Sequence, residues 1–174
     1  IKDRFFVFPI KLDTEPQAFY LQVHSQYSLS VPMELWTPQA FHEESQNRSM
    51  LQGIYFGELL ALLAYNLLLF VYLRDRTFLF YTFFGISIGM AMFAGNGYGR
   101  VYLWQDLPHW DEISQCTCLS VASVFGIFFT KSFLETATHS PLLDKVLSLL
   151  AICFAFIVVA LPAAHYFHYS AEYL

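Results

Sequence analysis

The chain is poor in charge, and the charge it has is unevenly distributed. Only 13% of its 174 residues are charged, while 56% are hydrophobic. Soluble domains usually carry about a quarter charged residues. Most of the shortage falls after residue 50, where long stretches hold no charged side chain. The composition therefore excludes a single soluble domain and divides the chain near residue 50 into a polar part and an apolar part.

Other absences exclude classes of function. The net charge is −5 and no basic cluster occurs, which argues against a nucleic-acid partner. The sequence has no His-Glu-x-x-His and no Gly-x-Ser-x-Gly motif, so we expect no catalytic residue, no cofactor and no enzymatic activity of this chain. His109, Cys116, His165 and His168 match no spacing typical of a metal site, and we expect no bound metal. The three cysteines predict no disulfide framework.

The chain begins with neither methionine nor a basic-then-apolar signal segment. It starts inside a run that is typical of a β-strand. We therefore expect it to be a piece of a longer protein.

The most informative feature that is present is the apolar run from Gly53 to Leu73. Its only charged residue is Glu58, and it ends against Arg74-Asp75-Arg76. A helix needs about 20 apolar residues to cross a bilayer. Three similar runs follow at 78–94, 113–130 and 146–164. The sequence therefore predicts a multi-pass membrane protein, with a transmembrane bundle over 51–174.

The basic residues predict how these spans are oriented. If residue 50 lies outside the cytoplasm, the inner loops hold Arg74, Arg76, Lys131 and Lys145, and the outer loop holds only Arg100. This distribution obeys the positive-inside rule, and the opposite orientation violates it. The part of the chain before the first span is therefore expected to be extracytoplasmic.

The N-terminal part alternates apolar and polar residues in short runs. This period of two, bounded by proline and serine, is the pattern of β-strands, and it predicts strands at 5–10, 18–24 and 31–37. We interpret residues 1–38 as the end of an extracytoplasmic β-domain, because three strands are few for an independent fold. Residues 39–50 are predicted to be a polar helical linker.

The polar residues of the first span share one helical face. At about 100° per residue, Tyr55, Tyr65, Asn66 and Tyr72 fall on the same side as Glu58. Lipid cannot satisfy such groups, so the face is expected to point into the bundle. Glu58 and Asn66 could form a buried network that switches between states, and Tyr55 and Tyr65 are further candidates. The alternative is that they are hydrogen-bonding residues that hold helices together.

Two other spans carry small residues at helical spacing. The second contains Gly85 and Gly89, which allow helix backbones to approach closely. The third places Ser120 and Ser123 on a stripe with Cys116 and Thr130. We interpret these residues as helix packing. A transport pathway along the third span is the functional alternative.

The outer loop between the second and third spans is rich in aromatic residues. Tyr98 and Trp104, with Tyr102 and Trp110, are typical of the aromatic belt at a membrane surface. The alternative is a contact surface for the outer domain or for a ligand, formed by Tyr98, Arg100 and Trp104.

Several strings in the sequence together resemble one bacterial family. They are Pro-Met-Glu-Leu-Trp at 32–36, Gly-Ile-Tyr-Phe-Gly at 53–57, Ala-Tyr-Asn-Leu at 64–67, Leu-Arg-Asp-Arg-Thr-Phe-Leu-Phe-Tyr at 73–81, Gly-Tyr-Gly at 97–99, Tyr-Leu-Trp at 102–104 and Lys-Ser-Phe-Leu at 131–134. In this order they resemble the seven-transmembrane receptors with diverse intracellular signalling modules, in the version with the type-2 extracellular domain.

The resemblance implies a bacterial inner-membrane receptor with an outer β-sandwich sensor of jelly-roll type, which would bind a carbohydrate-like ligand. It also implies seven spans, of which this chain holds four, and a downstream cytoplasmic output module such as a histidine kinase or a cyclic-di-GMP synthase. A homodimer is compatible with this interpretation. The rival hypothesis is a transporter or channel component with a polar pathway near Glu58 and Asn66. A purely structural anchor would need only one span.

Overall fold

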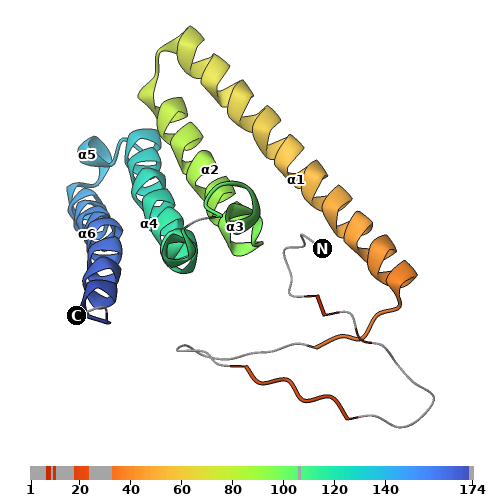
Figure 1. The fold of residues 1–174 in the computed structure, drawn as a ribbon. Coiled ribbons are helices and arrows are strands. Elements are labelled where there is room, and N and C mark those ends of the chain that lie inside the picture. The colour runs from red at the N-terminus through yellow and green to blue at the C-terminus, as the bar shows by residue number, and fades with distance from the viewer. Residues whose placement is uncertain (1–6, 9, 11–17, 24–32, 106, 173–174) are drawn as a thin grey trace.

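The computed structural model describes residues 7, 8, 10, 18–23, 33–105 and 107–172, and it is mainly helical from Pro38 onward (Figure 1). The helices in chain order are α1 (Pro38–Leu73), α2 (Arg76–Gly95), α3 (Tyr98–Tyr102), α4 (Pro108–Phe133), α5 (Thr136–His139) and α6 (Pro141–Glu172).

Four of these helices are long and apolar enough to cross a membrane. The candidate spans are Pro38–Leu73, Arg76–Gly95, Trp110–Phe133 and Pro141–Tyr166, and they contain the four predicted apolar runs. The prediction of four membrane-spanning helices is therefore confirmed by length and composition. The last helix also continues past Pro162 to Glu172, because proline is tolerated in membrane helices when neighbouring groups satisfy the freed carbonyl.

Local chemistry determines where α1 begins and where α2 follows it. Thr37 accepts a hydrogen bond from Ala40 N over 3.3 Å, and Pro38 follows in the first turn, where proline fits best. The helix ends at Arg74, whose φ of 54° is left-handed. Asp75 then caps α2 by accepting from Thr77 N over 2.9 Å. These two residues alone reverse the chain between two spans.

The predicted linker at 39–50 is part of α1 and not a separate element. The helix runs through its 36 residues, which corresponds to about 54 Å at a rise of 1.5 Å per residue. The segment that leads into the membrane is therefore continuous with the first span.

The long helices form a row and not a closed ring (Figure 1). Among the described residues, α1 packs only on α2, α2 also packs on α4, and α4 packs on α6. The predicted bundle is therefore an open layer in which α4 lies between two long neighbours and α1 is at one edge.

Small side chains occupy the buried positions of this row. The buried residues of α2 are Thr77, Thr82, Gly85, Ser87, Gly89, Ala91 and Ala94. Helix packing in membranes uses such residues because they let the backbones approach closely. By contrast, α1 has no buried residue.

The predicted strands are not present in the part of the N-terminal region that the structure describes. Residues 18–23 and 33–37, like 7, 8 and 10, belong to no strand, and Tyr20 is 95% exposed. A strand is held by hydrogen bonds to a neighbouring strand, and these segments have no such partner among the described residues. The rest of the ranges 5–10, 18–24 and 31–37 lies outside the described residues.

Candidate functional site

The connection between α2 and α4, which is called the outer connection because the predicted orientation places it outside the cytoplasm, is held by one polar cluster. Trp104 is buried, and its Nε1 donates a hydrogen bond to Asp111 Oδ1 over 2.9 Å. Arg100 Nε lies 4.0 Å from Asp111 Oδ2. Gly99 packs so closely on Trp104 that an added Cβ would lie 2.0 Å from Cζ2 of the indole. The cluster thus ties α3 to the first turn of α4.

A chain of aromatic rings connects this outer connection to α1. Phe56 of α1 meets Phe93 of α2 edge to face, with ring centroids 5.8 Å apart. Phe93 stacks on Tyr98 at 5.4 Å, and Tyr98 stacks on Tyr102 at 6.2 Å. The structure therefore brings Tyr98, Arg100 and Trp104 into one outer region. Asp111, which contacts both Trp104 and Arg100, was not identified from the sequence. The signal that could have identified it is an acidic residue shortly after the aromatic run.

Paired aromatic rings run along the interface between α2 and α4. Phe83 stacks on Phe125 with centroids 5.0 Å apart, and Tyr81 meets Phe129 at 5.4 Å. At the end of the same interface Thr77 Oγ1 and Ser132 Oγ share a hydrogen bond of 2.7 Å. The two helices are thus joined by rings along their length and by a polar bond at the end opposite the outer cluster.

A second polar cluster joins α4 to α6 at that same end. Lys131 Nζ lies 3.1 Å from Asp144 Oδ1 and donates to Ser148 Oγ over 2.6 Å. Asp144 also accepts from Thr136 Oγ1 over 2.7 Å. In the sequence, Lys131 had been informative for the orientation of the spans and as part of the string at 131–134. The sequence signal that could have predicted this cluster is the placement of a base, Lys131, and an acid, Asp144, on either side of a short connection between two spans.

A cavity of about 350 Å³ opens near this end. Its polar lining includes Asn66, Asp75, Thr77, Ser132 and Glu135. Asn66 Nδ2 donates to Leu62 O of its own helix over 2.8 Å, so it contributes no bond to a neighbouring helix through that nitrogen. The Thr77 backbone N–H holds the pKa of Asp75 below its usual range, so the rim stays acidic at neutral pH.

Glu58 and the three tyrosines that share its helical face do not lie on the face that α1 packs against α2. That packing face carries Phe56, Leu59 and Leu63, about 120° around the helix from Glu58 at roughly 100° per residue. Glu58, Tyr55, Tyr65 and Tyr72 are exposed, with Tyr65 at 59% and Tyr72 at 85%. The face of α1 that meets the glycines of α2 is therefore a different one from the face predicted to point into the bundle.

The residues assigned to packing have distinct positions. Gly85 and Gly89 lie against α1, where added Cβ atoms would be 2.6 Å from Leu63 Cδ2 and 2.7 Å from Leu59 Cδ2. Ser120 is buried, whereas Ser123 is half-buried. Each serine donates to a carbonyl of its own helix, on Cys116 and Leu119 respectively, over 2.9 Å.

The histidines and cysteine near the outer end are not assembled with one another in the described part of the chain. His165 Nε2 lies 3.1 Å from Glu112 Oε2 and so connects α6 to α4. Cys116 is exposed. The side chains of His109 and His168 lie outside the described residues.

Two family models match this chain. The model described as 7TM diverse intracellular signalling covers residues 48–174, and the model described as 7TMR-DISM extracellular 2 covers residues 1–37. No curated protein and no solved structure matches the chain. The boundary between the two matches lies at the start of α1, close to the composition change near residue 50. The chain, with its four membrane-spanning helices, belongs to the family of seven-transmembrane receptor-like signalling proteins with diverse intracellular modules.

Proposed function

We propose that this chain is the coupling part of a receptor in a bacterial inner membrane, between an extracytoplasmic sensor domain of jelly-roll type and a cytoplasmic output module. The observation that carries the proposal is the contrast between α1 and the other helices. The first span is continuous with the segment that follows the region matched to the extracellular domain, and among the described helices it packs on α2 alone. The other spans are joined to each other at both ends.

In this mechanism the sensor moves α1 against a fixed row of α2, α4 and α6. A continuous helix transmits a displacement along its length, because its backbone hydrogen bonds hold it straight. A ligand shifts the equilibrium between two positions of α1 only through its differential affinity for them. The ring contacts from Phe56 through Phe93 to Tyr98 support the proposal that a displacement of α1 is transmitted to the outer connection. The chain itself carries out no chemistry in this proposal.

The proposed orientation puts the α1–α2 turn on the cytoplasmic side. It is supported by the positions of Arg74, Arg76 and Lys131, which follow or end spans at the same end of the row (Figure 1). Single cysteines introduced by Leu134→Cys and Gln105→Cys in a cysteine-free variant test it. We expect a membrane-impermeant maleimide to label residue 105 in intact spheroplasts and residue 134 only after permeabilisation. The reverse pattern would contradict the orientation.

The ligand class and the receptor role are tested together on the intact protein in proteoliposomes. We expect a carbohydrate from a panel of oligosaccharides to raise the unfolding temperature saturably, without accumulation of that sugar inside the vesicles. Accumulation that is lost in Glu58→Gln would favour the transporter alternative, since Glu58 is the ionisable residue of the first apolar run. Stabilisation by none of the sugars would contradict the carbohydrate assignment.

A further inference from the structure

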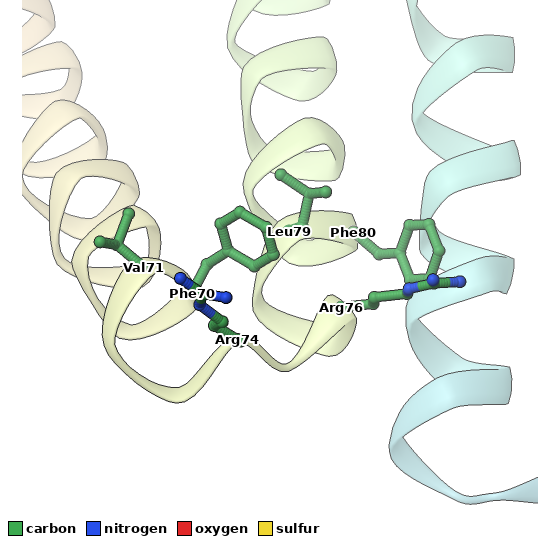
Figure 2. A pocket seen from close by; sticks show the side chains of 6 residues that line it. All are labelled: Phe70, Val71, Arg74, Arg76, Leu79 and Phe80. Atoms are coloured by element: carbon green, nitrogen blue, oxygen red, sulfur yellow. The ribbon is translucent and has the colours of Figure 1, made fainter.

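The turn between α1 and α2 forms an open groove that carries two arginines. The groove has a volume of about 630 Å³ and is lined by Phe70, Val71, Arg74, Arg76, Leu79 and Phe80 (Figure 2). The ring of Phe70 lies between α1 and α2 beside Leu79, and both arginines lie at the turn, with the Arg76 side chain directed toward α4 in this view. The groove therefore joins an apolar wall to a basic rim at the end of the membrane-spanning helices.

Among the residues that the structure describes, no acidic side chain lines this groove. The acid between the two arginines, Asp75, lines the cavity on the other side of the turn, and it caps α2 through Thr77 N. Glu135 also lines that other cavity. The two hollows at this end of the row therefore differ in charge, and the positive charge of Arg74 and Arg76 is not balanced by an acid within the groove.

Arg74 occupies a backbone conformation that would be less strained for glycine. Its φ is 54°, and its backbone N–H closes α1 by donating to Phe70 O over 2.7 Å. Left-handed closing positions of helices are usually glycine because a Cβ is unfavourable there. Backbone strain of this kind is a sign of a functional position. Here it sets an arginine side chain at the edge of the groove, to which Arg76 contributes a second one from the first turn of α2.

We propose that this groove binds one anionic phospholipid. The phosphate would be held by Arg74 and Arg76 through charge-assisted hydrogen bonds, and the first part of the acyl chains would lie on Phe70, Leu79 and Phe80. Basic pockets between membrane helices are suited to anionic head groups in this way. The apolar wall is what distinguishes a lipid from free phosphate. A lipid bound here would contact both α1 and α2 at the turn about which α1 is proposed to move.

The test is native mass spectrometry of the purified chain in micelles during titration with phosphatidylglycerol. We expect one bound phosphatidylglycerol at low concentration, and binding roughly 30-fold weaker in the double variant Arg74→Gln/Arg76→Gln, at the contribution typical of two surface arginines. Lys145→Gln is the matched control, because it removes one positive charge from α6 near the same end without touching the groove. Its affinity is expected to stay within about twofold of the wild type.

Two further arms keep the outcome decisive. Arg74→Lys/Arg76→Lys retains both charges and is expected to bind more tightly than the glutamine variant; equal loss in both would indicate a disturbed turn and overturn the site. Phosphatidylcholine and inorganic phosphate are the competing probes. If phosphatidylcholine binds as tightly as phosphatidylglycerol, the groove is an unselective apolar lipid contact and the proposal is overturned. If millimolar phosphate displaces the lipid, the groove is a site for free phosphate, which also overturns the proposal. A loss of about fivefold in Lys145→Gln, which is the same loss per charge as in the double glutamine variant, would point to general charge attraction and also overturn the proposal.

Discussion

The interface between α1 and α2 and the interface between α2 and α4 are built from different materials. Leucine tips of α1 lie against glycines of α2, and α1 buries no residue. Between α2 and α4, paired rings and the Thr77–Ser132 hydrogen bond join the helices, and the Trp104–Asp111 bond closes the outer end. The two interfaces therefore differ in composition, although one ring pair, Phe56 and Phe93, also joins α1 to α2. In the proposed mechanism, this difference makes α1 the helix that moves.

The largest effect on the free energy of unfolding is expected from a change that disrupts the contacts between the α2–α4 connection and α4. Gly99→Ala places a methyl group 2.0 Å from the indole of Trp104, which has to move and give up its bond to Asp111. Overpacking of this kind costs about 1–3 kcal/mol of the free energy of unfolding, and we expect the upper end because the ring is rigid. Denaturation of the purified protein in micelles measures it. A loss below about 0.5 kcal/mol would mean that the outer cluster is loosely packed.

A smaller effect is expected at the turn that both interfaces share. Asp75→Ala removes the cap of α2 and should cost about 1 kcal/mol, whereas Asp75→Asn keeps an accepting oxygen and should cost little. The Thr77 N–H lowers the pKa of Asp75 in the folded state. Its contribution is therefore complete above the ordinary carboxyl pKa and is lost as the pH falls through the lowered value.

Unfolding measured from neutral to acid pH checks this sign. The difference in stability between the wild type and Asp75→Asn should change only in the acid range, since the amide does not titrate there. A difference that grows above neutral pH would contradict the assignment.

The smallest effect on stability is expected at the interface between α1 and α2. Gly89→Ala brings a Cβ to 2.7 Å from Leu59 Cδ2, but that atom is the end of a flexible side chain and can turn aside. Alanine also favours a helix over glycine by about 0.5–1 kcal/mol. The two terms nearly cancel, so we expect a change below about 0.5 kcal/mol together with a shifted position of α1. A loss as large as that of Gly99→Ala would remove the contrast between the interfaces.

The parts of the fold that follow from local chemistry could be predicted from the sequence. Length and apolarity give the four spans, and Arg74 to Arg76 marks the first turn, because these depend on single segments and the bilayer. The strands before Pro38 could not be established from the alternation of apolar and polar residues alone, because a strand also needs a neighbouring strand with which to pair. The helical linker predicted at 39–50 is the first part of α1, because nothing in that segment breaks a helix.

The candidate site could be predicted only in part, for the same reason. Tyr98, Arg100 and Trp104 stood out because aromatic and charged residues cluster in one loop. Asp111 did not, because its partner is chosen by how α3 turns back onto α4. The polar face around Glu58 was predicted to point inward on the rule that lipid excludes charge. The face that packs on α2 was set instead by Gly85 and Gly89, which the rule does not consider.

The central claim is that α1 moves against a fixed row, and spin-label distances test it directly. Labels at residues 54, 92 and 119 replace exposed side chains on α1, α2 and α4 in a variant without native cysteines. Double electron–electron resonance in nanodiscs should give a broad distribution for the 54–92 pair and a narrow one for the 92–119 pair. Distributions of equal width, or a broader one between α2 and α4, would contradict the account.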